Sequence, residues 1–311
     1  MDKTPEQTLA ASAYVLGFAL IIGFTDNFVR LMAEETGLWQ FHAIRSVMVL
    51  ILVLAAGRIW GFALRPRNWL RVAARSALHG TALLIYFGAL GFMPVAQVAA
   101  GLFTAPIFVL LIAWLWQGQP IGPVRIVAVG LGFAGVLLVL GPEAMRGASL
   151  AALLPILAGF LYAVGNVATR EWCAGESAAT LALGFFVALG VMGFAGLAVL
   201  TIWPTEAAPG AAGFIQRGWV TPSALFLGVT LLQAVGSLVG VSLLVRAYQI
   251  AEASRVSVFE YLNLPAAAMW GWLLWSEVLP PLALLGMALI AGAGALIALR
   301  ARQSTEQSPT A

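Results

Sequence analysis

Apolar windows long enough to cross a lipid bilayer follow one another along nearly the whole chain. A membrane-spanning helix needs roughly 17 to 25 predominantly apolar residues. Five such windows lie in the first half of the sequence and five in the second: residues 9–32, 39–56, 76–92, 95–116 and 124–140, then 150–169, 181–203, 224–245, 256–275 and 282–299. Backbone polar groups inside lipid must bond within their own element, and these windows lack the alternation of barrel strands. The sequence therefore predicts an all-α, polytopic membrane protein with about ten transmembrane helices.

The composition indicates that hydrocarbon is the solvent of this chain. Charged residues make up 9% and hydrophobic residues 61% of the 311 positions, whereas soluble domains have about 25% charged residues. We therefore expect the lipid bilayer as a partner. The net charge is only +3 and the arginines flank apolar windows, so we expect no nucleic-acid partner. Cys173 is the single cysteine, which excludes an intramolecular disulfide.

The basic residues predict the orientation in the membrane. With the N-terminus inside, the external segments hold only Arg146 and Arg217. The cytoplasmic segments then hold Lys3, Arg58, Arg65, Arg67, Arg71, Arg75, Arg125, Arg170, Arg246, Arg255, Arg300 and Arg302. Because basic residues accumulate on the cytoplasmic side, we expect a multi-pass protein of the cell inner membrane, with residues 1–8 and 300–311 as cytoplasmic tails.

The second half of the sequence repeats the first. The aligned pairs are Pro106 with Pro265, Trp116 with Trp275, Gly135 with Gly294 and, at a second offset, Asn27 with Asn166. The repeats are residues 9–141 and 150–299. Since each contains an odd number of predicted helices, the second must enter the membrane upside down relative to the first. Inverted repeats are typical of transporters, whose substrate sites lie near the midplane between the halves.

Polar side chains form matching stripes in the leading helix of each repeat. Asp26, Asn27 and Arg30 share one face of the first helix, and the repeat places Tyr162 and Asn166 in the corresponding helix of the second half. An ionisable group inside the bilayer is costly, so Asp26 needs a partner or a water-filled cavity. We interpret the stripes as walls of a shared substrate site. A purely structural pair of Asp26 with Arg30 is the alternative.

Two further windows carry polar residues on one helical face. His79 and Tyr86 occupy such positions in the third predicted helix, and Gln233 and Ser237 in the eighth. We interpret all four as candidate substrate-binding residues. Hydrogen bonds that only join neighbouring helices are the alternative.

Pro106 and Pro265 interrupt the fourth predicted helix of each half. Proline removes a backbone donor and bends a helix. The predicted bends lie beside Phe103 in the first half and beside Glu260 and Tyr261 in the second. We expect these three side chains to line the site and the prolines to act as hinges. Kinks that serve packing alone are the alternative.

Several kinds of chemistry lack the residues they require. Lys3 is the only lysine, which excludes a Walker A phosphate loop and hence ATP hydrolysis by this polypeptide. His42 and His79 are too few for a metal cluster, and the sequence has no HExxH or CxxC motif. We therefore expect no catalytic residues, no metal and no cofactor, and we interpret the chain as a non-enzyme.

This pattern resembles the drug/metabolite transporter superfamily, whose ten-helix carriers contain two EamA-type repeats. The resemblance covers residues 9–299. It rests on residues 86–116 and 244–277 with their prolines, on Glu277 at the end of the ninth predicted helix, and on the glycine-rich fifth and tenth helices. Gln117 and Gln119 flank the position where the first repeat would carry the matching glutamate, so that glutamate has no required role here. The subgroup most resembled is the YddG-type exporters of aromatic and other amino acids.

The resemblance implies a secondary transporter that exports small metabolites, with amino acids as the expected cargo. Asp26 and Glu260 would suit an ammonium group, and Arg30 or Arg45 a carboxylate. A nucleotide sugar or a drug-like cation on the same fold is the alternative. The sequence leaves proton coupling and oligomeric state open.

Overall fold

The computed structural model describes residues 5–33, 35–61, 64–90, 92–93, 95–145 and 150–306, and every regular element in these ranges is helical. Three are short 3₁₀ turns: η1 (Pro142–Met145), η2 (Leu150–Ala152) and η3 (Gly210–Gly213). The α-helices are α1 (Pro5–Asp26), α2 (Arg30–Ala33), α3 (Leu38–Trp60), α4 (Trp69–Ala89), α5 (Val95–Leu102), α6 (Ala105–Leu115), α7 (Pro123–Leu140), α8 (Leu153–Glu171), α9 (Ala178–Ile202), α10 (Ala224–Ile250), α11 (Ala253–Glu260), α12 (Asn263–Trp275) and α13 (Pro281–Glu306). The all-α prediction is confirmed.

The helices form the predicted polytopic membrane bundle. In the described part of the chain, 8 helical segments are long and apolar enough to cross a membrane, and one of these joins α5 and α6. The helix α4, which carries buried polar residues, and the broken pair α11 and α12 complete a set of ten crossing segments. The first five segments run from α1 to α7 and the second five from α8 to α13.

Short polar residues begin three of the long helices. Asn68 precedes α4, Ser177 precedes α9 and Ser223 precedes α10, and each side chain accepts a hydrogen bond from a backbone N–H of the first turn. These bonds satisfy donors that a helix start would leave without a partner. The helix starts at the membrane surface are therefore fixed locally by the sequence.

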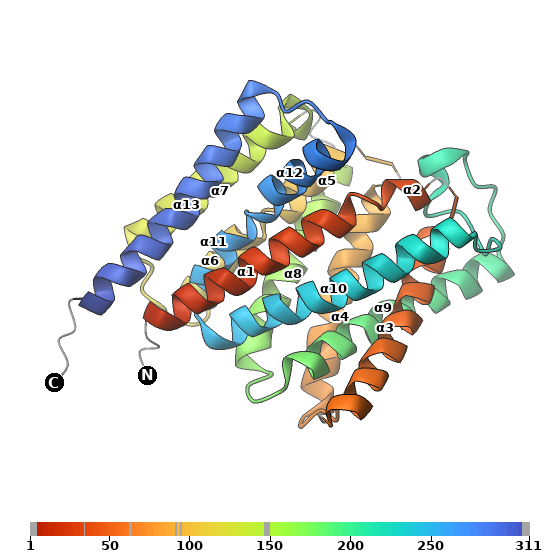
Figure 1. The fold of residues 1–311 in the computed structure, drawn as a ribbon, viewed down its shortest axis with the longest axis horizontal. Coiled ribbons are helices and arrows are strands. Elements are labelled where there is room, and N and C mark those ends of the chain that lie inside the picture. The colour runs from red at the N-terminus through yellow and green to blue at the C-terminus, as the bar shows by residue number, and fades with distance from the viewer. Residues whose placement is uncertain are drawn as a thin grey trace.

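The two halves pack as inverted equivalents of one another. The helix α1 packs on α10 and α12, and in the same way α8 packs on α4 and α6. The equivalent helices α3 and α9 pack together, as do α7 and α13, at opposite edges of the bundle (Figure 1). The inverted repeat is therefore visible in the contacts as well as in the aligned residues.

Glycine allows α7 and α13 to pack closely. A Cβ added at Gly135 in α7 would lie 2.6 Å from the carbonyl oxygen of Gly286 in α13, and one added at Gly286 would lie 2.5 Å from the carbonyl oxygen of Gly135. Small residues let helix backbones approach closely in membranes, where packing replaces the hydrophobic effect as the source of association.

Both ends of the described chain lie at the same end of the bundle. The helix α1 begins there and α13 ends there (Figure 1). Lys3 and Arg146, which contributed to the predicted orientation, lie outside the described residues. The cytoplasmic location of that end remains a prediction.

Candidate functional site

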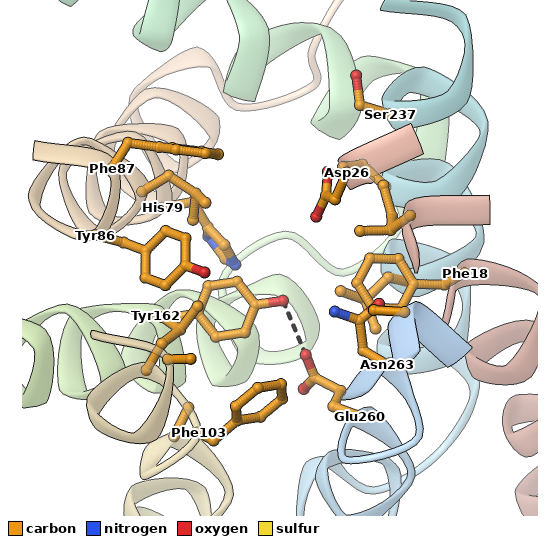
Figure 2. A pocket seen from close by; sticks show the side chains of 18 of the residues that line it. Phe18, Asp26, His79, Tyr86, Phe87, Phe103, Tyr162, Ser237, Glu260 and Asn263 are labelled. Carbon is orange, nitrogen blue, oxygen red and sulfur yellow. Dashed lines mark hydrogen bonds between the residues drawn. The ribbon is translucent and has the colours of Figure 1, made fainter. Parts of the chain in front are cut away.

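A cavity of about 620 Å³ lies between the two halves of the bundle (Figure 2). Both halves contribute polar side chains to its lining: Asp26, Arg45, Arg75, His79 and Tyr86 from the first, and Tyr162, Asn166, Gln233, Ser237, Tyr248, Glu260 and Asn263 from the second. Pockets of roughly 300 to 1,000 Å³ with a few convergent polar groups are typical of sites for small molecules.

Glu260 is the centre of a hydrogen-bond cluster on one wall. Its Oε2 accepts a bond from the Tyr162 hydroxyl at 2.8 Å. Its Oε1 accepts bonds from Asn166 Nδ2 at 3.1 Å and from the Tyr248 hydroxyl. Tyr162 and Asn166 belong to α8, Tyr248 to α10 and Glu260 to the end of α11. One carboxyl group therefore joins three helices of the second half.

The cluster continues into the first half through Asn166. Its Oδ1 lies 2.9 Å from His79 Nε2 in α4. Because the amide nitrogen of Asn166 faces Glu260, its oxygen is the atom that faces His79 Nε2, while His79 Nδ1 lies 3.2 Å from the Arg75 carbonyl oxygen. One turn earlier in α4, Arg75 donates to Thr169 Oγ1 at 2.9 Å and to the Leu181 carbonyl oxygen at 3.2 Å.

Asp26 lies across the cavity from His79 (Figure 2), and Arg45 is a further charged residue of the lining. Gln233 fixes Asp26 by donating to its Oδ1 at 3.3 Å and to the Thr25 carbonyl oxygen at 2.7 Å. Arg45 Nη2 lies 3.1 Å from His42 Nδ1. Arg45 Nε is buried and has no hydrogen-bond partner in the described part of the chain. Arg45 brings a guanidinium group to the cavity lining.

Aromatic rings fill much of the remaining wall. The lining includes Phe18, Phe87, Phe103, Phe185, Phe186 and Phe214 together with the three tyrosines. The Tyr162 and His79 rings meet edge to face at 5.2 Å between centroids. Such surfaces favour flat, partly polar molecules, since aromatic pairs add stabilisation beyond the area they bury.

Most of the residues predicted from the sequence line this cavity. They are Asp26, His79, Tyr86, Phe103, Tyr162, Asn166, Gln233, Ser237 and Glu260, together with the hinge candidate Pro106. Asn27, Tyr261 and Pro265 are absent from its lining.

Asn27 joins two helices instead of facing the cavity. Its Nδ2 donates to the Gly23 carbonyl oxygen at 2.7 Å and to the Ala267 carbonyl oxygen of α12 at 3.1 Å. The helix α1 ends at Asp26, so the helical spacing that grouped Asn27 with Asp26 stops applying there. The side chain of Arg30, the proposed partner of Asp26, lies outside the described residues.

Tyr261 packs away from the cavity and towards α7. Its ring occupies the space that a side chain at Gly132 would need, and it lies 6.2 Å from the Phe103 ring between centroids. The backbone at Tyr261 is still right-handed helical, and consecutive residues of such a backbone point about 100° apart, so Glu260 and Tyr261 face different neighbours.

Four polar lining residues were missing from the predicted site: Arg45, Arg75, Tyr248 and Asn263. Arg75 lies one turn before His79 on the same helical face, a spacing that would have identified it. The sequence analysis assigned it to a cytoplasmic segment, but in the structure it is 3% exposed. Arg45 had been considered only as a carboxylate partner. Nothing in the sequence marks Tyr248, which lies far along α10 from Gln233.

Both helices that contain the repeated prolines are interrupted next to the cavity. The helix α5 ends at Leu102 and α6 begins at Ala105, while α11 ends at Glu260 and α12 begins at Asn263. Each break precedes its proline by a few residues. The broken ends expose polar groups only where they line a protected cavity, as irregular backbone in a membrane requires.

The cavity is closed at one end of the bundle. There α6 packs on α11, whereas the equivalent pair α5 and α12 shows no comparable packing in the described residues. Accordingly α5 lines the cavity along its length, but α6 contributes only its first residues and α11 only its last. The closed end is the one at which α1 begins and α13 ends (Figure 1).

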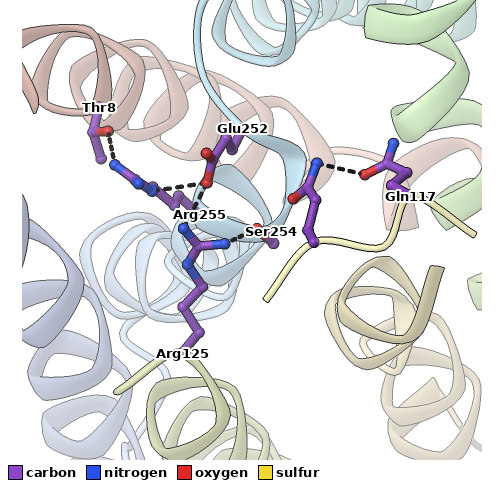
Figure 3. Close-up of polar contacts among 7 residues, drawn as sticks. Thr8, Gln117, Arg125, Glu252, Ser254 and Arg255 are labelled. Atoms are coloured by element: carbon purple, nitrogen blue, oxygen red, sulfur yellow. Dashed lines mark hydrogen bonds and ion pairs between the residues drawn. The ribbon is translucent and has the colours of Figure 1, made fainter. Parts of the chain in front are cut away.

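An ion-pair network crosses the closed end (Figure 3). Glu252 pairs with Arg125 of α7 at 2.6 Å and with Arg255 of α11 at 3.0 Å. Arg125 also donates to Ser254 Oγ at 2.9 Å, and Arg255 donates to Thr8 Oγ1 of α1 at 3.4 Å. The network thus links α1, α7 and α11 on the side where the cavity is sealed.

The donor set of the site suits an organic ligand better than a metal ion. No group of three or more His, Cys, Asp or Glu side chains in the described ranges could hold a metal. The lining combines separate single charges with amides and hydroxyls.

Comparison with known proteins gives the family. The profile of the EamA-like transporter family matches residues 9–141. The chain is 31% identical over 247 residues to a riboflavin transporter of Rhizobium johnstonii, covering 79% of this chain and 76% of that protein. It is 25% identical to a pseudopaline exporter of Pseudomonas aeruginosa, covering 88% and 91% respectively.

A solved protein structure has the same fold. It superposes with a TM-score of 0.70 at 18% sequence identity, covering 97% of this chain and 100% of the other. The two named relatives are both transporters of small molecules. The chain belongs to the EamA-like transporter family of the drug/metabolite transporter superfamily and is a multi-pass membrane transporter.

Proposed function

We propose that this protein is a secondary transporter that exports a small metabolite bearing an aromatic ring across a bacterial inner membrane. The observation that carries the proposal is the cavity between the two inverted halves, lined by aromatic rings and by polar groups from both. Transport proceeds by alternating access. In the other state the contact between α6 and α11 is broken and the equivalent contact between α5 and α12 is formed. The cavity then opens at the end that is closed in the present structure.

The dimensions of the cavity favour a cargo larger than a single amino acid. Its volume of about 620 Å³ lies in the middle of the range for sites that enclose drug-sized ligands. The 31% identical relative is named for riboflavin, a molecule with a flat ring system and a polar chain. Arg45 and Asn263, which both line the cavity, would meet its polar groups, and the phenylalanines its ring.

An amino acid is the second candidate, favoured by the opposite charges in the lining. Asp26 would accept the ammonium group and Arg45 would donate to the carboxylate, since both side chains line the cavity from the first half. Aromatic amino acids would use the same rings as a flavin. The two candidates differ in the charge that the cargo carries.

Counterflow in proteoliposomes tests the cargo. Proteoliposomes containing the purified protein are loaded with riboflavin, with an aromatic amino acid, with a nucleotide sugar or with a cationic dye. Exchange of the labelled cargo is then measured for each. We expect exchange of riboflavin. Exchange of amino acids alone would select the second candidate, and exchange of the nucleotide sugar or dye alone would refute both. Failure of every cargo, with folded and inserted protein, would refute the proposed class of cargo.

A pair of arginine variants tests the site. Arg45→Gln removes the cavity donor, and Arg58→Gln changes an exposed arginine near the end of the same helix. We expect Arg45→Gln to weaken cargo affinity at least about tenfold, the loss expected when a charged hydrogen bond is removed. Arg58→Gln should leave affinity unchanged. Equal behaviour of the two variants would exclude Arg45 from the site.

A further inference from the structure

Glu260 is a carboxyl group inside the membrane that has neutral partners only. Tyr162, Tyr248 and Asn166 donate its three hydrogen bonds. In the described part of the chain it forms no salt bridge, and the arginines that line the cavity bond elsewhere: Arg75 to Thr169 and Leu181, and Arg45 next to His42. A negative charge buried in a membrane is costly without a positive partner. A proton or a cationic group that reaches this carboxyl would relieve that cost.

A proton fits this position better than a cationic group of the cargo. A carboxylate has about four lone-pair sites, and three already accept hydrogen bonds from side chains. The group is only 7% exposed, so an ammonium group would have to displace one of these donors to reach it. A proton needs no space and reaches Glu260 through the water of the cavity that it lines.

We propose that Glu260 binds and releases a proton during each transport cycle, and that the export described above is therefore coupled to protons. The coupling rests on the proposed function, whereas the proton site itself does not.

The hydrogen bonds identify the oxygen that takes the proton. Oε1 faces two donors, and one of them, Asn166 Nδ2, cannot accept a hydrogen bond in return. Oε2 faces only the hydroxyl of Tyr162, at 2.8 Å (Figure 2). A proton added to Oε2 is donated to the Tyr162 oxygen, and the hydroxyl hydrogen of Tyr162 then turns into the cavity. Tyr248 and Asn166 keep their bonds to Oε1.

Protonation at this position affects a helix break. The helix α11 ends at Glu260 and α12 begins at Asn263. The ionised carboxylate holds the end of α11 to α8 and α10 through three accepted bonds. The neutral acid accepts two and donates one, so it holds the break less strongly. The equivalent position in the first half is Gly101, which packs against Pro155. Only one of the two breaks thus carries an ionisable group.

Apart from Tyr162 and Tyr248, the charged and titratable groups of the cavity form no hydrogen bond with Glu260 in the described part of the chain. His79 and Arg75 from α4 lie beyond Asn166. Asp26 from α1 lies across the cavity beside Gln233. The cavity lining from α6 and α7 is apolar, consisting of Ala105, Pro106 and Leu140. Asp26 is the other carboxyl group among the described lining residues, so replacing Asp26 isolates the titration of Glu260.

Infrared spectroscopy of the purified protein tests the site without any cargo. The C=O stretching band of a protonated carboxyl is followed between about pH 5 and pH 9, a range that covers strongly shifted buried carboxyl groups. We expect a titrating band in Asp26→Asn that is missing in the double variant Asp26→Asn/Glu260→Gln and shifted in frequency in Asp26→Asn/Glu260→Asp. The absence of a titrating band in folded Asp26→Asn protein, or its persistence in Asp26→Asn/Glu260→Gln, would overturn the proposal.

A pH gradient tests the coupling. Riboflavin is supplied to proteoliposomes with and without a gradient of one pH unit. The accumulation ratio is the amount of riboflavin accumulated with the gradient divided by the amount accumulated without it. One proton per cargo predicts a wild-type accumulation ratio of up to about tenfold. Glu260→Gln should give a ratio of one, whatever its absolute rate. A wild-type ratio of one, with riboflavin exchanging normally, would overturn the coupling. If riboflavin does not exchange, the cargo proposal fails and the infrared result still decides the proton site.

Discussion

The imidazole ring of His79 lies directly against the bare Cα of Gly165. A Cβ added at Gly165 would overlap the ring. This contact between α4 and α8 brings His79 Nε2 within 2.9 Å of Asn166 Oδ1, which in turn orients the Asn166 amide towards Glu260. A glycine is therefore required beside the asparagine for the two halves to share one hydrogen-bond cluster.

Replacing Gly165 by Ala should separate His79 from Asn166. Overpacking of a close contact costs about 1 to 3 kcal/mol, and the cluster beside the cavity should lose its orientation. We expect transport to fall at least about tenfold and the melting temperature in detergent to decrease. Gly228→Ala in α10 is the matched control, because a Cβ there meets no atom within 4 Å. Equal effects of both variants would show that the contact has no special role.

The two asparagines aligned by the repeat should behave differently. Asn27→Ala removes bonds that join α1 to α12, so it should lower thermal stability by about 1 kcal/mol or more while cargo affinity is retained. Asn166→Ala removes a donor to Glu260 in the cavity wall, and it should reduce transport more than stability. Melting curves and counterflow on both variants decide this. Reduced transport with unchanged stability for Asn27→Ala would contradict the structure.

The ion pairs at the closed end should bias the protein towards its present state. Glu252→Gln removes both charge pairs of the network. Partly exposed pairs are worth up to about 1 kcal/mol, which is roughly a fivefold change in the ratio of two states. We expect Glu252→Gln to favour opening of the end that is now closed.

Thiol labelling measures that opening. Cys173 is the only native cysteine, so Cys173→Ala gives a cysteine-free background, and Leu244→Cys adds a probe in the cavity lining. An impermeant maleimide is applied from the side of the closed end. The labelling rate should rise about fivefold with Glu252→Gln and should not change with Glu171→Gln, an exposed carboxylate at the same end. An unchanged rate with Glu252→Gln would exclude the network as a stabiliser of this state.

The contact between α7 and α13 should be the most sensitive part of the scaffold. Gly135→Ala would place a methyl group 2.6 Å from the Gly286 carbonyl oxygen, and we expect the melting temperature to fall by about 5 °C. Gly130→Ala in the same helix points into open space. It should be neutral or stabilising by up to about 1 kcal/mol, because alanine favours the helix more than glycine does. A similar decrease in both would refute the packing argument.

The architecture could be predicted from the sequence because hydrocarbon imposes strict requirements on length and composition. The site was harder to predict where a helix ended. Asn27 was placed on the face of Asp26 by helical spacing, but α1 ends at Asp26. Tyr261 was placed in the site with Glu260, but consecutive residues of a helical backbone face different directions. Spacing arguments hold only within an uninterrupted helix, and transporters interrupt their helices at the site.

The arginines of the cavity were missed for a related reason. A basic residue near a window edge indicates orientation, and Arg75 was interpreted in that way. In the structure α4 begins at Trp69, well before the apolar window, so Arg75 is inside the bundle. A hydropathy window leaves out a helical turn that contains a charged residue, even when that residue is buried. Here Thr169 and Leu181 accept the hydrogen bonds of the buried Arg75.

The unequal packing of the two broken helices also has a pharmacological consequence. With α6 sealed against α11 and no comparable seal between α5 and α12 in the described residues, the cavity is already formed towards the end of the bundle remote from the start of α1. A molecule that fills this space but is too bulky for α5 to close over it would hold the carrier in one state. With the predicted orientation, such an inhibitor would act from outside the cell and would never need to cross the inner membrane.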